Sequence, residues 1–133
     1  HGTSEGICCV IGELSERLAK SGQKKFTSVG YHPTRMPAHL SPEQRCDRLI
    51  EVEEIDLTPQ VALQMWVDIL AARIDPSEVR LLAIGGGTIA SFEIRLALAL
   101  GASVAVVPLT GGAAEAKYKV QGYKGSTGVQ AGP

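Results

Sequence analysis

Residues 81–102, LLAIGGGTIASFEIRLALALGA, decide the fold. An apolar run leads into three consecutive glycines, and a second, largely apolar segment follows with only Glu93 and Arg95 as charges. The first run is typical of a buried strand, and the second predicts a helix that ends at Gly101. Glycines between two buried elements serve either a tightly packed turn or the close approach of a ligand to the backbone.

The segments on both sides continue this alternation of strands and helices. VRLLAI at 79–84 and SVAVVPL at 103–109 are continuous apolar runs, which are typical of parallel strands covered on both faces. A further short strand is expected within 25–33. Helices are predicted at three other places: 7–20, 59–73 and a short stretch after Gly112. The pattern predicts an α/β fold in which helices flank a Rossmann-like parallel sheet.

Length and composition indicate one soluble domain. The chain has 133 residues, with 13 basic and 14 acidic side chains and a net charge of −1. This balance predicts no broad attraction to nucleic acid or to an anionic membrane. No apolar run approaches the roughly 20 residues that span a bilayer. We expect a single domain over 1–121 and a Gly-rich mobile tail over 122–133.

The cysteines give little chemistry by spacing alone. Cys8, Cys9 and Cys46 are odd in number and show no metal-ligand pattern, so we expect no metal site and a reduced, cytoplasmic protein. Cys8 and Cys9 fall near the start of the first predicted helix, where a thiolate is favoured, although small buried side chains are the commoner case. The chain opens with HGTSEG and shows no basic-then-apolar leader.

Three glycine-bearing turns precede predicted helices: HGTSEG at 1–6, GGGT at 85–88 and TGG at 110–112. In an open α/β sheet such turns line the crevice at the carboxyl ends of the strands. Each helix N-terminus there offers unpaired N–H groups and a positive dipole end, which suit a phosphate. Packing alone explains one such turn, whereas three together favour a bound ligand. The predicted ligand contacts are Gly2, Thr3, Ser4, Gly6, Gly85, Gly86, Gly87, Thr88, Thr110, Gly111 and Gly112.

No turn carries a Walker A loop or a G-x-G-x-x-G fingerprint, so a nucleotide-like ligand is favoured over ATP hydrolysis. Glu93 lies early in its helix and has two interpretations. It is either a carboxylate that the helix dipole favours and that pairs with Arg95 or another cation, or a group that contacts a ribose hydroxyl or acts as an acid or base on a glycosidic bond.

The helix predicted over 59–73 is unusually apolar. Thr58 suits its N-cap and Pro59 its first position. Only one of its four rows is polar, formed by Gln60, Gln64 and Asp68. Such a helix needs cover on more than one side, from a neighbouring helix or a second subunit. This helix is therefore our candidate for the interface of a homo-oligomer.

Two stretches resemble a known superfamily. GTSEGI at 2–7, followed by Gly12, and the long segment at 63–107 resemble the SLOG superfamily, most of all its LSDAT branch of prokaryotic relatives of the cytosolic N-terminal domain of TRPM channels. The likeness extends more distantly to the LOG phosphoribohydrolases and other lysine-decarboxylase-like Rossmann proteins. It covers the chain up to about Pro108 and is most specific at 81–107.

The resemblance implies a Rossmann-like domain that binds a nucleotide derivative such as an ADP-ribose-type molecule. The family's first glycine loop maps to Gly2, Thr3, Ser4 and Gly6; its second maps to Gly85, Gly86, Gly87 and Thr88, with Glu93 as the acid that follows. The LOG enzymes carry P-G-G-x-G-T-x-x-E, whereas here Ile84 replaces the proline and four residues separate Thr88 from Glu93. The family's first strand would precede residue 1, so the predicted domain lacks it.

The leading hypothesis is therefore a binding or sensor domain for a nucleotide-derived small molecule, without a further cofactor. The alternative is a phosphoribohydrolase-type enzyme that cleaves an N-glycosidic bond, with Glu93 and Arg95 as its catalytic residues. A third possibility is a structural domain whose glycines serve packing alone.

Overall fold

The computed structural model describes residues 4–54, 58–114, 116 and 130–132. The chain forms two compact units, His1–Met65 and Trp66–Pro133. Helices and parallel strand pairs occur along the chain, which confirms the α/β class. The described strands form two small sheets, with the orders β1-β2 and β3-β4-β5, and not one continuous sheet. One domain over 1–121 stays a prediction.

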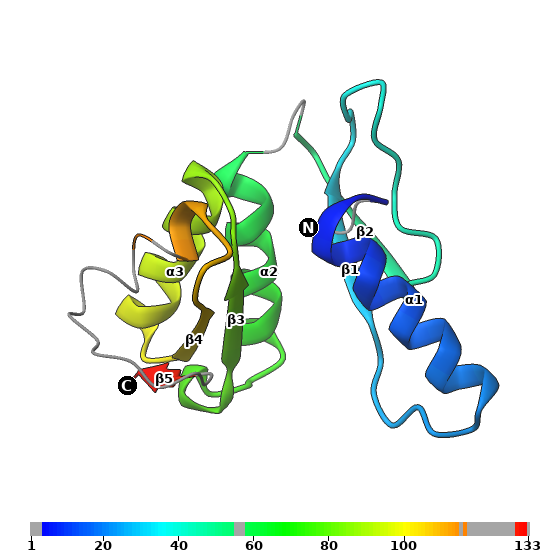
Figure 1. The fold of residues 1–133 in the computed structure, drawn as a ribbon. Helices are drawn as coiled ribbons and strands as arrows, with labels where there is room; N and C mark the ends of the chain where they lie inside the picture. The colour runs from blue at the N-terminus through cyan, green and yellow to red at the C-terminus, as the bar shows by residue number, and fades with distance from the viewer. Residues whose placement is uncertain (1–3, 55–57, 115, 117–129, 133) are drawn as a thin grey trace. The chain divides into compact units, whose positions relative to one another are not determined.

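The first unit contains one helix and one parallel strand pair (Figure 1). These elements are α1 (Gly6–Lys20), β1 (Val29–Pro33) and β2 (Arg48–Val52). β1 and β2 pair in parallel from Val29↔Arg48 to Pro33↔Val52. Helix α1 ends as predicted, because Gly22 has a φ of +69° and its N–H donates to the Ala19 carbonyl. The sequence analysis did not predict β2.

A polar network fixes the start of the β1–β2 pair. The Ser28 N–H and hydroxyl donate to Asp47 Oδ2 over 2.7 and 2.9 Å, and the Asp47 N–H donates back to Ser28 Oγ over 3.0 Å. Lys24 forms an ion pair with the same carboxylate. The buried Ser15 hydroxyl of α1 lies 3.1 Å from Ser28 Oγ. The network therefore ties the helix to both strands at one end of the sheet.

This network makes the stability of the first unit sensitive to acid. The Lys24 ammonium, followed by the Ser28 N–H and hydroxyl, lowers the pKa of Asp47 from its ordinary 3.8 to about 2. The contribution of Asp47 is therefore complete above about pH 4 and is lost as the pH falls through about 2. We expect the urea midpoints of the parent chain and Asp47→Asn to differ clearly at neutral pH and to converge at the acid end of that window. A constant difference across the window would contradict this account.

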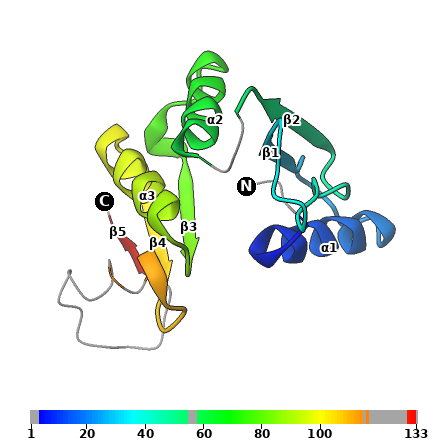
Figure 2. The ribbon, with the colours of Figure 1, turned by 90° about the horizontal axis from the view of Figure 1, so that it is seen from above.

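The second unit is built around a three-stranded sheet and one packed helix. Its elements are the C-terminal part of α2 (Pro59–Ala71), η1 (Pro76–Glu78), β3 (Arg80–Ile84), α3 (Thr88–Leu100), β4 (Ser103–Val107) and β5 (Gln130–Gly132). β3 and β4 pair in parallel, and β5 joins β4 antiparallel. Figure 2 shows α3 alongside the β3–β4 pair, with which it makes its sheet contacts. The predicted helices and strands of this segment are thus confirmed within about two residues.

The structure tests two predictions at the C-terminal end of the chain only in part. Residues 130–132 form β5, so this part of the predicted tail pairs in the sheet. The remainder of the tail, and most of the short helix expected after Gly112, lie outside the described residues.

Small side chains allow α3 to lie close to the sheet. Ala83, Val104 and Val106 are buried on the strands, and Ile94 and Ala97 are buried on α3. Burying a side chain the size of Ile94 contributes roughly 2 kcal/mol before entropy is counted. Gly101 ends α3 in the left-handed conformation, with a φ of 92°, as the sequence predicts. This close packing sets where the N-terminus of α3 meets the strand ends.

Helix α2 differs in one way from its sequence prediction. The Thr58 hydroxyl does not cap the helix, because Oγ1 is buried without a hydrogen-bond partner in the described part of the chain. The apolar positions Leu63, Val67 and Leu70 are 41%, 55% and 47% exposed. Trp66 is buried at 3% exposure. The exposed row is the part of this helix that remains available for a subunit contact.

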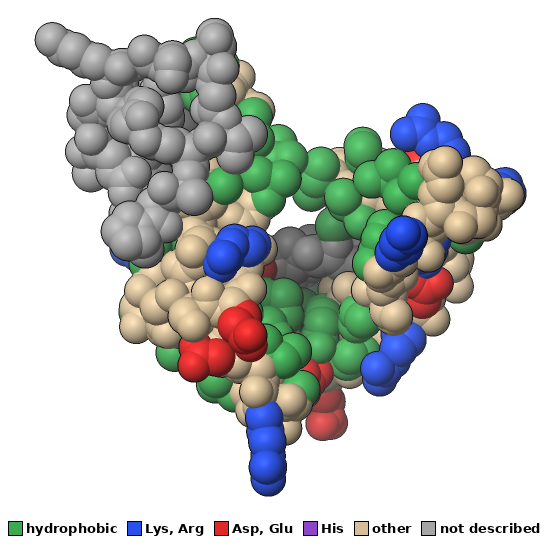
Figure 3. All heavy atoms as spheres, turned by 90° about the horizontal axis from the view of Figure 1, so that it is seen from below, with side chains coloured by type: hydrophobic (Ala, Val, Ile, Leu, Met, Phe, Trp, Pro, Cys, Tyr) green, Lys and Arg blue, Asp and Glu red, His purple; other side chains and the backbone are tan. Residues whose placement is uncertain are grey.

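The surface mixes apolar and charged side chains. Figure 3 shows hydrophobic side chains exposed on one face together with both acidic and basic ones. On β3, Leu82 and Ile84 are 56% and 36% exposed, so one side of this strand is open among the described residues. Within the described residues, no helix is both long and apolar enough to cross a membrane.

Candidate functional site

Two of the predicted glycine turns lie against each other in the second unit. They follow β3 and β4, which are neighbouring parallel strands and therefore end at the same sheet edge. The Gly85 N–H donates to Thr110 Oγ1 over 2.9 Å. The Ala113 N–H donates to the Gly86 carbonyl over 2.7 Å, and the Ala114 N–H donates to the Gly85 carbonyl over 3.0 Å. The turns at 85–88 and 110–112 thus form one hydrogen-bonded unit.

Packing accounts for two of these glycines. A Cβ on Gly112 would lie 2.0 Å from the Gly86 carbonyl oxygen, and a Cβ on Gly86 would lie 2.4 Å from the Ala90 Cβ. Both residues also have positive φ angles, +57° at Gly112 and +93° at Gly86. A side chain at either position would therefore be strained and would also force the turns apart. The packing explanation holds at these two positions.

Packing does not account for Gly87. A Cβ there would meet nothing within 4 Å, and with φ −102° and ψ −149° the backbone is not left-handed. Gly87 is the N-cap of α3, and within the described residues no side chain caps this helix end. Gly86, Gly87 and Thr88 are all exposed. The N-terminus of α3 therefore combines an open backbone with a positive dipole end, which is the arrangement that an anion requires.

The two remaining positions of these turns have separate roles. Thr110 accepts from Gly85 and donates its own hydroxyl to the Val107 carbonyl over 2.7 Å, so it braces the turns. Gly111 has a φ of +74° and open space around its Cβ position. Thr110 is exposed and Gly111 is half-buried.

Glu93 and Arg95 are not brought together. Glu93 is half-buried on α3, whereas Arg95 is exposed, and no ion pair joins them in the described structure. Burial raises the pKa of the Glu93 carboxyl. The expected pairing of Glu93 with Arg95 is therefore not formed, and the influence of the helix dipole on Glu93 stays a prediction. A half-buried acid with a raised pKa is compatible with either ligand contact or proton transfer.

The first glycine turn belongs to the other unit. Gly2 and Thr3 lie outside the described residues. The Ser4 N–H donates to the Ser41 carbonyl over 2.8 Å, and the Ser41 hydroxyl donates to Ser4 Oγ over 2.9 Å. Gly6 starts α1 with a φ of +63° and open space around it. That all three turns share one crevice stays a prediction.

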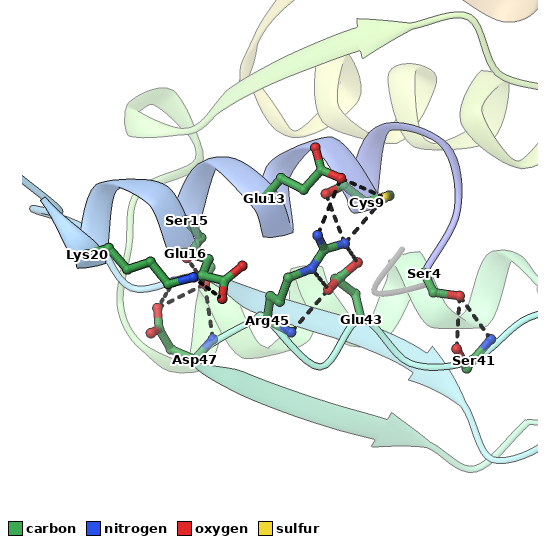
Figure 4. A network of polar contacts seen from close by, with 11 residues as sticks. Ser4, Cys9, Glu13, Ser15, Glu16, Lys20, Ser41, Glu43, Arg45 and Asp47 are labelled. Carbon is green, nitrogen blue, oxygen red and sulfur yellow. Dashed lines mark hydrogen bonds and ion pairs between the residues drawn. The ribbon is translucent and has the colours of Figure 1, made fainter.

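The sequence analysis missed a second polar centre, around Arg45. Figure 4 shows its guanidinium between Glu43 and the α1 residues Cys9 and Glu13. Arg45 donates to both carboxylate oxygens of Glu43, over 2.6 and 2.7 Å, and the Glu43 residue is only 2% exposed. The spacing Glu-x-Arg hints at such a pair, but only the folded chain shows that it packs against α1.

Neither a metal site nor a similarity to known proteins assigns a further role to these residues. Among the described residues, no three His, Cys, Asp or Glu side chains come together in a way that would hold a metal ion. No family model, no curated protein and no solved structure matches the chain.

Proposed function

We propose that this chain is a binding or sensor domain for a nucleotide-derived small molecule of the ADP-ribose type. A phosphate would lie at the N-terminus of α3, against the backbone N–H groups of Gly87 and Thr88. The observation that carries the proposal is the open, uncapped Gly87 beside the braced turn at 110–112. Packing explains Gly86 and Gly112, whereas no steric contact requires a glycine at Gly87.

The proposal also covers the Rossmann-like fold and the family of the chain. The β3–α3–β4 segment, with both strands parallel and the glycine turns at their carboxyl ends, is what a Rossmann-like domain requires. The motifs at 2–7 and 81–107 support membership of the SLOG superfamily, in its LSDAT branch. The resemblance extends the proposed ligand contacts to Gly2, Thr3, Ser4 and Gly6 of the first unit.

A substitution at Gly87 separates ligand binding from stability. Aspartate is a good N-cap, so Gly87→Asp should fold at least as well as the parent chain, while its carboxylate repels a phosphate. We expect Gly87→Asp to weaken binding about tenfold to a hundredfold. The matched Gly87→Ser variant also caps the helix but adds no charge, and it should bind nearly as the parent does.

The binding measurement is titration calorimetry after a thermal-shift screen of AMP, ADP-ribose, cyclic ADP-ribose variants, NAD and cytokinin-type nucleotides. A parent chain that binds none of these ligands would overturn the proposal. Unchanged binding in both variants would mean that the site lies elsewhere, and equal weakening by both would mean that shape, not charge, decides binding.

An enzyme of the phosphoribohydrolase type is the second candidate, favoured by one observation. The pKa of Glu93 is raised by burial, and a raised pKa makes a carboxyl better suited to act as a general acid. Product analysis of each ligand distinguishes the two candidates. In the enzyme, free base and sugar phosphate would appear and would vanish with Glu93→Gln, while binding survived; in the sensor, the ligand is recovered intact.

The proposal also covers the cellular location and the oligomeric state of the domain. A cytoplasmic homo-oligomer would use the exposed row Leu63, Val67 and Leu70 of α2 as its contact. These residues follow a 4-then-3 spacing, which suits helix-to-helix packing. Sedimentation of a strictly monomeric chain at high concentration would remove this part of the proposal and leave ligand binding standing.

A further inference from the structure

Leu109 combines two features that do not stabilise the fold. Its side chain is 89% exposed, more than that of any other large apolar residue in the described part of the chain. Its backbone has a φ of +61°, in the left-handed region that residues with a side chain rarely adopt. A single exposed leucine is common on a protein surface and needs no explanation. A leucine that is both strained and almost fully exposed does need one, because each feature costs free energy.

The other left-handed position outside glycine has a structural cause. Among the described residues, Arg73 is the one further non-glycine residue with a positive φ, +59°. It follows the end of α2, where the Ile74 N–H donates to the Ile69 carbonyl over 3.2 Å. This hydrogen bond belongs to the motif in which many helices end with a left-handed residue. Leu109 follows a strand and not a helix, so this cause does not apply to it.

The turn after β4 holds Leu109 in this conformation. Pro108 precedes it, and the hydroxyl of Thr110, which follows it, donates to the Val107 carbonyl over 2.7 Å. A proline followed by a residue with a positive φ is typical of a type II turn, which favours glycine or asparagine at the position of Leu109. Thr110 also accepts from the Gly85 N–H, so the turn is fixed to the end of β3. A residue suited to the left-handed region would therefore relieve the strain and keep both hydrogen bonds.

Leu109 lies at the same edge of the sheet as the proposed phosphate position. β3 and β4 end together there, because Ile84 and Val107 are partners in the parallel register. This edge exposes the backbone of Gly87 at the start of α3, the Ile84 side chain at 36% exposure, and Leu109. Free N–H groups suit a phosphate, whereas apolar side chains suit the flat face of a ring. The edge thus offers a polar surface and an apolar surface, which match the two ends of a nucleotide.

We propose that Leu109 packs against the base of the nucleotide ligand and so selects ligands that carry a base over bare sugar phosphates. This inference rests on the proposed function, because a phosphate at the N-terminus of α3 is what places the ligand at this edge. Binding buries the leucine side chain, and the burial of apolar surface offsets the strain of the turn. Leu109 is therefore a specificity residue, whereas Gly87 and Thr88 bind the phosphate that all of these ligands share.

Leu109→Asn removes the apolar contact and relieves the strain in one substitution. Asparagine tolerates the left-handed region, so without ligand this variant should unfold at a higher urea concentration than the parent, as followed by Trp66 fluorescence. In titration calorimetry we expect its affinity for AMP and ADP-ribose to fall about tenfold, with no change for ribose 5-phosphate, which lacks the base. The matched Leu109→Met variant keeps an apolar side chain and should bind all three ligands as the parent does.

The inference and the proposed function fail in different ways. A parent chain that binds neither AMP nor ADP-ribose removes the proposed function, and this inference with it. If the parent binds them and Leu109→Asn binds them equally well, the inference is overturned and the proposed function stands. Equal weakening for ribose 5-phosphate would show that residue 109 acts through the shape of the turn, and a lower urea midpoint for Leu109→Asn would show that leucine supports the fold. Either of these results also overturns the inference.

Discussion

Gly112→Ala is expected to lower the free energy of unfolding of the second unit by about 3–4 kcal/mol. The new Cβ would lie 2.0 Å from the Gly86 carbonyl oxygen, and that oxygen belongs to backbone which is itself hydrogen-bonded to Ala113. The clash therefore cannot be relieved by a side-chain rotation. Trp66, the single tryptophan, is buried in the same unit and reports the transition by fluorescence in urea.

Gly111→Ala is the matched control. Gly111 also has a positive φ, +74°, but a Cβ there would meet nothing within 4 Å. Gly111→Ala should therefore lower the free energy of unfolding only by the conformational strain, about 1–2 kcal/mol. If both variants unfold at the same urea concentration, the contact between the two turns contributes little, and the shared site at their edge loses its structural basis.

Gly12→Ala is expected to destabilise the first unit by about 2–3 kcal/mol, against the normal preference of a helix interior for alanine. Its Cβ would lie 2.6 Å from Cδ of Glu43, whose carboxylate is buried and held by Arg45. To make room, Glu43 must move, and its ion pair with Arg45 must break or stretch. Circular dichroism during urea unfolding measures the loss.

A double-mutant cycle identifies the cause. In the Glu43→Ala background the obstructing carboxylate is gone, so adding Gly12→Ala should be neutral or should stabilise by up to about 1 kcal/mol. This change of sign is what steric conflict with Glu43 predicts. The same loss in both backgrounds would show that Gly12 is needed for another reason, such as the path of α1.

Local patterns predicted most of the described elements. The apolar periodicity of 7–20 and 59–73, and the apolar runs around Gly85 and Gly101, were enough for α1, α2, β3, α3 and β4. The turns at 85–88 and 110–112 were also expected at one edge, since parallel strands bring their carboxyl ends together. These features depend on sequence-local rules and on a general topological constraint.

The missed features depend on contacts between distant residues. β2 is only five residues long and includes Arg48 and Glu51, so its pattern was too weak to distinguish from a loop; its pairing with β1 decides the structure. The contacts of Arg45 with Cys9 and Glu13 join a loop to a helix more than thirty residues away. The sequence also could not show which glycines are required by packing, because that depends on neighbours in the fold, such as Gly86 beside Gly112.

The strand pairings described above also bear on how fast the chain reaches its native state. Every described pairing joins residues about twenty to thirty positions apart, from Val29↔Arg48 to Val104↔Gly132. No described pair is a tight hairpin, so the sheets cannot begin from a local nucleus. Helices form within microseconds, whereas loop closure and non-local pairing are slow, so α1 and α3 should acquire structure well before either sheet does. During that interval the apolar strands β3 and β4 are unprotected, and a newly made chain is then most prone to aggregate.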